Sequence, residues 1–340
     1  MLLSMKTIRA LPALALLGCL LLNPLTAAEP ERAPEDPNLI WTPAHVVLVS
    51  QQVAPGVFAV FPDDSAAKNP GGIPAATSGG FVIGNNGVLV VDTMLNRRLA
   101  NQLLALIRAQ TDAPILYIIN TSYHGDHSYG NQFFPGGVEI AEHAATQAYI
   151  HDHFPQDVAF MMTYFGHNSG MEELKPQPAQ ILLHDGADVT FDLGGKRVNV
   201  LHLGFAQTDG DLFVWLPGEK VLFTGNPVIS IAPSLPWLLD GKSEQSLATM
   251  RRLRALVPDD AIIVPGHGRP AGVEMIDYPI GYLSELRSQV GTAIDAGLTE
   301  QETVAKLAES MKGYSGYRIF PWVHSQVNVP KTYQEMKAKR

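Results

Sequence analysis

Short runs of β-branched and aromatic residues, separated by glycine, recur through the first part of the chain and are typical of strands. The predicted strands cover residues 57–61, 80–83, 88–91 and 115–119. Apolar residues at 99, 103, 106 and 107 follow helical spacing and predict a helix before the last of these strands. That strand leads into a polar loop over residues 120–127, and a helix is expected near residues 144–151.

The same alternation of strands and helices returns in the second half. Strands are predicted at residues 189–193, 197–203, 212–216, 221–224 and 261–264. A helix is predicted over residues 243–256, and the remainder is helical, with an apolar stripe at 283, 286, 290 and 294. Thr299 and Glu302 have the spacing of a capping box. Strands interleaved with helices predict an α/β sandwich rather than separate modules.

The amino-terminal segment differs from the rest of the chain. Lys6 and Arg9 precede an apolar run over residues 11–22, and small residues end it at Ala28. This order is typical of a cleavable secretory signal peptide over residues 1–28, and it predicts a periplasmic protein. The alternative is a membrane anchor, but the run is shorter than the roughly 20 apolar residues that a span needs. Residues 29–50 are interpreted as a flexible lead-in, and residues 51–340 as the folded domain with carboxy-terminal helices.

Charge and cysteine content narrow the possible partners. The formal net charge is −9, and loss of the basic leader makes it about −11, which argues against binding to nucleic acid or to anionic membranes. Cys19, the one cysteine, lies inside the leader, so the mature chain is expected to have no disulfide. Other apolar runs are short, so no membrane span is expected in the mature chain.

Two loops carry residue types that bind metals. His124, Asp126 and His127 lie within four residues after a predicted strand, and zinc accepts imidazole nitrogen and carboxylate oxygen. Taken alone, this loop is equally compatible with a solvated polar turn. His267 follows another strand between two glycines, which let the backbone place it tightly. Neither fragment decides the chemistry by itself.

The order of the motifs resembles the metallo-β-lactamase superfamily from residue 57 to about residue 270. The motifs, in order, are residues 90–93, the loop at His124, residues 204–211, residues 222–226 and His267. This resemblance implies an α/β fold, the four-layer αββα sandwich, with a metal site on one edge. It specifies the fold far better than the substrate.

Departures from the family pattern fall mainly on one of its two metal positions. Ser122 and Gln207 stand where the family has histidines, and Asn226 stands where it has a bridging acidic residue or a cysteine. The resemblance therefore implies the loss of the first metal, which keeps only His124. It implies retention of the second, with Asp126, His127 and His267 as ligands. We expect one divalent metal, zinc, with an open coordination position for water.

Two function classes follow from this site. The first is a periplasmic hydrolase of a small acyl compound (a lactam, lactone, ester or thioester). In it, Asp126 holds the metal and orients the water, and His124 is a general base or a donor to the oxyanion. The second is an inactive binding protein on the same fold, since fold does not determine function. Metal analysis separates the two classes.

Several other residues have two readings. Histidines at 143, 151, 153 and 167 occur in a stretch that also contains Met161, Met162, Tyr164 and Phe165. We interpret this stretch as a wall of the substrate pocket rather than as an ordinary surface helix pair. His202, in an apolar strand, is interpreted as a core histidine. Trp237 is equally compatible with a pocket position and a packing role.

Export is tested by the mature amino terminus. The basic start, the apolar core and the Ala28 exit predict cleavage near Glu29. Mass spectrometry of the protein from its native cell should find a chain that starts there. A cellular protein that retains Met1 or Met5 would contradict this prediction.

Overall fold

The computed structural model describes residues 39–167 and 169–340. The expected leader, residues 1–28, and the first part of the expected lead-in, residues 29–38, lie outside the described residues. The rest of that lead-in is part of the fold, which corrects the expected boundary at residue 50. Trp41 is buried against Phe165, with ring centroids 4.4 Å apart, and the first strand begins before residue 50. Burial of an aromatic ring fixes this segment, and residues 39–50 are mostly apolar, unlike the polar residues 29–37 before them.

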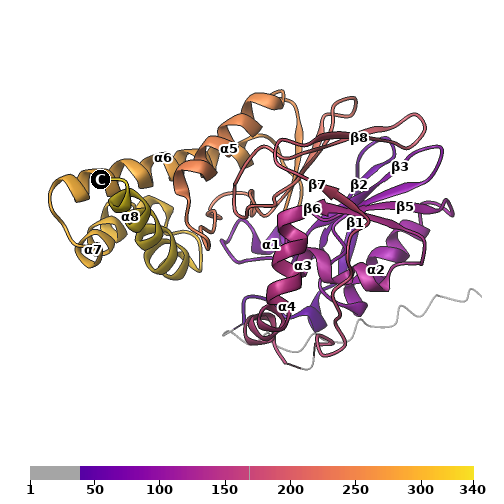
Figure 1. Ribbon diagram of the computed structural model, residues 1–340, viewed down its shortest axis with the longest axis horizontal. Coiled ribbons are helices and arrows are strands. Elements are labelled where there is room, and N and C mark those ends of the chain that lie inside the picture. Colours follow the sequence, from indigo (N-terminus) through magenta and orange to yellow (C-terminus); the bar gives the residue numbers. More distant parts are fainter. Residues whose placement is uncertain (1–38, 168) are drawn as a thin grey trace, which may run out of the picture. The chain divides into compact units, whose positions relative to one another are not determined.

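Two β-sheets form the centre of the described chain (Figure 1). The first sheet has the order β1-β2-β3-β4-β5-β6-β7, and β4 to β7 pair in parallel. Its strands are β1 (Leu48–Ala54), β2 (Val57–Pro62), β3 (Gly79–Ile83), β4 (Val88–Val91), β5 (Ile115–Ile119), β6 (Glu139–His143) and β7 (Ile181–Leu183). The second sheet has the order β12-β11-β10-β9-β8, in which only β11 and β12 are parallel among these strands. Its strands are β8 (Asp188–Asp192), β9 (Arg197–Leu201), β10 (Phe213–Leu216), β11 (Val221–Gly225) and β12 (Ile262–Pro265).

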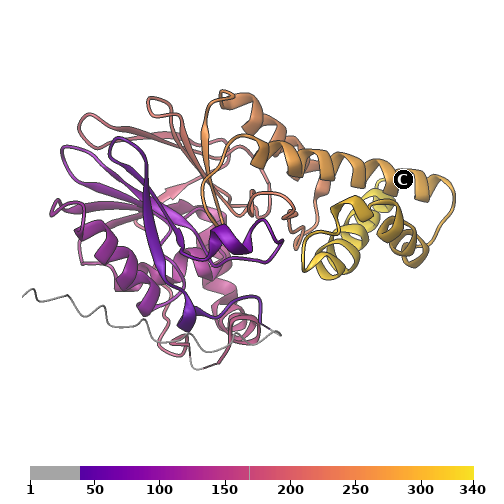
Figure 2. The same cartoon turned by 180° about the vertical axis from the view of Figure 1, so that it is seen from behind.

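The described residues form eight α-helices: α1 (Ser65–Lys68), α2 (Arg97–Arg108), α3 (Gly125–Ser128), α4 (Ala144–Phe165), α5 (Ser243–Leu256), α6 (Glu274–Asp295), α7 (Glu300–Ser310) and α8 (Val329–Ala338). Of these, α2, α4, α5 and part of α6 cover the outer faces of the two sheets (Figures 1 and 2). Leucines of α2 and apolar residues of α4 pack with one face of the first sheet, while α5 and α6 pack with one face of the second. The remaining two faces pack on each other. The four-layer αββα sandwich expected from the motif order is confirmed.

The carboxy-terminal helices form their own apolar cluster around Tyr282, Leu286 and Phe320. The capping box of Thr299 and Glu302 is present at the start of α7, as the spacing predicted. Within the described residues, no helix is long and apolar enough to span a membrane.

Most strands and helices lie where the periodicity predicted them, with three additions. β1, β6 and β7 have mixed or short patterns that gave no separate signal. α4 continues to Phe165, well past the expected residues 144–151. β1, at the edge of the sheet, and the partly exposed α4 carry little periodic signal, because few of their side chains reach the core, whereas β6 is an internal strand whose apolar residues are interrupted by Glu142 and His143.

Glu142 in β6 places a carboxyl group inside the first sheet. It is buried, and its Oε2 has no hydrogen-bond partner among the described residues. Burial raises the pKa of this carboxyl to about 8. The group therefore stays protonated in the folded chain, while in the unfolded chain it ionises above its ordinary value of 4.5.

This difference predicts a pH-dependent stability. Below about pH 4.5 Glu142 is protonated in both the folded and the unfolded chain, and the free energy of unfolding has its full value. As the pH rises from 4.5 toward 8, the unfolded chain loses this proton first, so the free energy of unfolding falls. The loss amounts to roughly 3–5 kcal/mol by linkage. We expect Glu142→Gln to flatten the fall when unfolding by urea is measured at pH 4.5, 6 and 8. Glu139→Gln, at an exposed position of the same strand, is the control and should keep it. Parallel curves for Glu142→Gln and the parent would contradict the assignment.

Candidate metal centre

The predicted site residues meet where strands of both sheets end. Asp92 follows β4, the loop of residues 120–128 follows β5, Asn226 follows β11, and His267 lies two residues beyond β12. The carboxyl ends of parallel strands lie at one edge of a sheet, which explains why these segments meet. Backbone hydrogen bonds join the two sheets there: Ser78 N–H donates to Gly266 O at 2.7 Å, and Leu212 N–H donates to Thr121 O at 2.9 Å.

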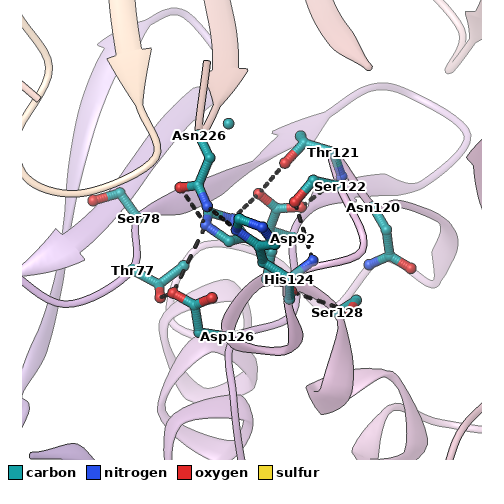
Figure 3. Close-up of polar contacts among 12 residues, drawn as sticks. Thr77, Ser78, Asp92, Asn120, Thr121, Ser122, His124, Asp126, Ser128 and Asn226 are labelled. Carbon is teal, nitrogen blue, oxygen red and sulfur yellow. Dashed lines mark hydrogen bonds and ion pairs between the residues drawn. The ribbon is translucent and has the colours of Figure 1, made fainter. Parts of the chain in front are cut away.

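Asp92 connects the loop to the sheet (Figure 3). Its buried carboxylate accepts hydrogen bonds from the Thr121 backbone N–H and hydroxyl, both at 2.8 Å. Its Oδ2 also lies 2.7 Å from Nδ1 of His127. The Asp92 backbone has φ of 60°, a left-handed conformation that aspartate tolerates better than most residues. Asp92 lies in the motif of residues 90–93, and the sequence alone indicated no role for its side chain.

Asp126, His127 and His267 face one another, as predicted. Asp126 Oδ2 lies 3.8 Å from Nε2 of His127 and 3.7 Å from Nε2 of His267. One ligand atom from each of the three residues lies within 4.8 Å of the others. Tetrahedral zinc with bonds near 2.05 Å has ligand atoms about 3.3 Å apart, so a small contraction brings this group to coordination geometry. All three side chains are buried.

The hydrogen bonds of the two imidazoles fit a metal. His127 Nδ1 is bonded to the Asp92 carboxylate, and His267 Nδ1 donates to Ala75 O at 3.1 Å. Both Nδ1 atoms therefore carry protons. Nε2 of His267 is left available as a ligand, whereas Nε2 of His127 also lies 2.9 Å from Asn226 Oδ1 and carries a proton that a metal has to displace. A carboxylate or carbonyl behind each imidazole is the usual support for a metal-binding histidine. A divalent cation fits this group.

The charges at the site favour a cation. Burial opposes ionisation of Asp126, but His127, His267 and the Thr77 hydroxyl, which donates at 2.6 Å, hold its pKa below the usual value. Burial also opposes protonation of His127, yet Asp92 and Asp126 outweigh it and raise the pKa of His127 to about 9. Burial lowers the pKa of His267 to about 4. A metal that binds here displaces the Nε2 proton of His127.

Asn226 links His127 to His124 (Figure 3). Its Oδ1 lies 2.9 Å from Nε2 of His127, and its Nδ2 donates to Nδ1 of His124 at 2.7 Å. Burial lowers the pKa of His124 to about 4, so its imidazole is neutral near pH 7. Because Nδ1 accepts from Asn226, the proton of neutral His124 is on Nε2.

Residues that replace the expected histidines are buried in other roles. Ser122 Oγ accepts the backbone N–H of His124 at 3.2 Å. The side-chain amide of Gln207 is buried, and neither of its polar atoms has a hydrogen-bond partner in the described part of the chain. His124 is connected to the ligand group through Asn226, while Ser122 bonds within its own loop.

A second cluster, formed by His143, Asp185 and His202, has the spacing of a metal site but the wrong tautomers. His143 Nδ1 accepts from the Ala145 N–H, and His202 Nδ1 accepts from the Gly186 N–H. Each neutral ring must then carry its proton on Nε2, which blocks coordination there. Asp185 is 90% exposed. His202 is buried, as expected of a core histidine, but its Nε2 has no partner within the described residues.

A cavity of about 290 Å³ adjoins the ligand group. Residues of α4 form one wall, including His153, Met161 and Phe165, and Trp237 lies on another. The interpretation of this stretch as a pocket wall is therefore supported by the cavity lining, although His151 and His167 are exposed and His143 stacks on His202. Asn69 and Ser230 also line the cavity, and the sequence carried no signal for either.

Comparison with known proteins agrees with the fold. The family model described as "Metallo-beta-lactamase superfamily" matches residues 73–267, more than half of the chain. The chain belongs to this superfamily. It is 26% identical over 204 residues to a type 2 metallo-β-lactamase of Bacteroides fragilis, covering 59% of this chain and 73% of that protein.

A second relative is an alkylsulfatase. The chain is 24% identical over 270 residues to a linear primary-alkylsulfatase of Pseudomonas sp., covering 68% of this chain but only 50% of that protein. The solved structure of a sec-alkylsulfatase from Pseudomonas sp. superposes with a TM-score of 0.66 at 14% identity, over 86% of this chain and 50% of that one. A metallo-β-lactamase from Pontibacter korlensis superposes with a TM-score of 0.53 at 19% identity, over 70% and 99%. These structural likenesses show the fold alone.

The ligand assignment predicts how metal content responds to mutation. Protein purified without chelator should hold about one divalent metal per chain. His267→Ala or Asp126→Ala should abolish tight binding, because each removes one of three ligands. Asp92→Asn should weaken binding roughly 10–100-fold, since it removes the support behind His127. His153→Ala, a cavity histidine outside the ligand group, is the matched control. Metal binding by His267→Ala equal to that of the parent would refute the assignment.

Proposed function

We propose that this chain is a periplasmic, mononuclear, zinc-dependent hydrolase of an acyl compound, whether lactam, lactone, ester or thioester. The observation that carries the proposal is the orientation of His127 and His267. Both imidazoles are bonded through Nδ1 and direct Nε2 at Asp126, beside a cavity. A buried cluster of this kind is costly to form without a cation. The leader of residues 1–28 supports the periplasmic location.

The metal, when bound, supplies polarisation of a carbonyl group and a water of lowered pKa. The surrounding residues determine where the charges and protons go. Asp126 is held by the Thr77 hydroxyl through Oδ2, so its carboxylate is oriented toward the ligand group. It both binds the cation and orients the attacking water by accepting a hydrogen bond from it.

The geometry narrows the role of His124. Its Nδ1 already accepts the Asn226 N–H, so this nitrogen has no free lone pair for a proton from water. Its remaining N–H, on Nε2, belongs to a ring that lines the cavity. Of the two roles open from the sequence, the contacts favour donation to the developing oxyanion over general base catalysis.

The competing function, a metal-free binding protein, is favoured by the changes at Ser122, Gln207 and Asn226. Without the anionic bridge, two neighbouring cations would repel each other strongly, but one cation meets no such obstacle. Metal analysis of the purified protein, followed by a broad hydrolytic screen of metal-loaded protein, separates the two functions. A chain that takes up no metal even after reconstitution would replace the hydrolase with the binding protein.

The proposed role of His124 predicts a separation of binding from turnover. His124→Ala should leave the metal bound and lower kcat on an activated ester by about 10²–10³-fold, the usual effect of losing one oxyanion donor. His124→Gln restores an N–H donor and should recover part of the rate. The measurements are metal content and steady-state kinetics on the same samples. Loss of metal from His124→Ala, or an unchanged kcat, would count against the role.

A further inference from the structure

The side chains that line the cavity beside the metal centre are acidic, apolar and neutral polar groups together with His124, His153 and His267. Among the described residues that line it, none is a lysine or an arginine. The acidic residues Asp157 and Asp240 lie in its walls, each accepting a hydrogen bond from a buried tyrosine hydroxyl at 2.6 Å. Ile40, Phe160 and Trp237 contribute apolar surface. Away from a cation held by the ligand group, an anionic substituent on the substrate would meet carboxylates and hydrocarbon, with no lysine or arginine to replace its water.

Two neutral polar side chains that also line the cavity have no hydrogen-bond partner among the described residues. The amide of Asn69 and the hydroxyl of Ser230 are 1% and 5% exposed, respectively. Neither Asn69 Oδ1, Asn69 Nδ2 nor Ser230 Oγ has a hydrogen-bond partner within residues 39–167 and 169–340. Buried polar groups are almost always paired in native proteins, and exceptions call for an explanation such as a ligand.

Asn69 and Ser230 lie next to each other and next to the metal centre. A Cβ atom on Gly268 would lie 2.0 Å from Asn69 Oδ1 and 2.9 Å from Ser230 Oγ. Both oxygens therefore lie within about 5 Å of each other, beside the residue that follows His267. Gly268 has φ of 108°, so both its conformation and the close approach of Asn69 require glycine.

We infer that Asn69 and Ser230 form a specificity subsite for a neutral carbonyl or amide group. The substrate is an uncharged ester, lactone or thioester with an apolar body and one further neutral polar group. This inference rests on the proposed function for the reaction but not for the binding preference. It predicts that sulfate esters and acyl compounds with a free carboxylate are poor substrates, because no lysine or arginine lines the cavity to bind either group.

Three matched esters test the substrate class: the 4-nitrophenyl esters of adipamic, heptanoic and adipic acid, which end in an amide, an alkyl and a carboxylate group. With metal-loaded protein, kcat/KM for the amide ester should exceed that for the carboxylate ester by at least about tenfold. Phe160→Arg places a cation at a position that is 40% exposed, and it should reduce this preference. Equal kcat/KM for the amide and carboxylate esters would overturn the inference.

Variants of the two side chains test the subsite. Asn69→Ala and Ser230→Ala should raise KM for the amide ester several-fold more than KM for the heptanoate ester, with the larger effect in KM than in kcat. Neither should lower the melting temperature, because each removes an unpaired buried group. Thr332→Val removes an unpaired buried hydroxyl from α8 and is the matched control, with KM unchanged. Unchanged KM in both cavity variants would show that the subsite is wrongly assigned.

A binding measurement keeps this inference separate from the proposed function. Calorimetry on metal-free protein compares 4-phenylbutanamide with 4-phenylbutanoate. The amide should bind at least about tenfold more tightly, and Asn69→Ala should remove that preference. If no ester is hydrolysed but the amide is preferred, the hydrolase proposal fails and the subsite stands. If the carboxylate binds equally well, the subsite inference fails whatever the hydrolytic result.

Discussion

The site depends on one buried carboxylate, that of Asp92. It accepts hydrogen bonds from Thr121 N–H, from Thr121 Oγ1 and from His127 Nδ1. These contacts join the end of β4 to the loop after β5 and set the tautomer of a ligand histidine. A buried carboxylate without partners would lower the stability of the fold. The hydrogen bonds of Asp92 therefore hold Thr121 and His127 in place. The loop that carries Asp126 and His124 is thereby positioned by a group that never reaches the cavity.

A neutral amide at Asn226 changes what the remaining residues can do. A carboxylate at this position would attract a second cation and would accept protons from both neighbouring histidines. The amide instead accepts on one side and donates on the other, which assigns opposite roles to His127 and His124. Asn226 therefore underlies two parts of the proposed function: a single cation, and His124 as a donor.

The cavity and the metal centre place opposite demands on a substrate. The centre needs an electrophilic carbonyl, whereas the wall of Asp157, Asp240 and apolar side chains disfavours negative charge. The solved metallo-β-lactamase and alkylsulfatase structures share the fold, but most side chains that line this cavity, apart from residues such as His124, Asn226 and His267, lie outside the motifs named above. Fold membership and substrate preference are therefore separate questions, and the second is answered by the cavity alone.

From the amino-acid sequence follow the fold class, most strands and helices, and the grouping of Asp126, His127 and His267, which the structure brings within 4.8 Å of one another. Hydrophobic periodicity indicates which residues are buried, and candidate metal-binding residues occur in short motifs after strands. Both are local patterns and can be recognised in the sequence. Only the tertiary structure shows which hydrogen bonds Asp92 and His124 make and which ring nitrogens of His143 and His202 accept hydrogen bonds. It also shows that Asn69 and Ser230 lie side by side. These depend on which nitrogen carries a proton and on which distant side chains meet. Such contacts join residues up to 161 positions apart and leave no local pattern in the chain.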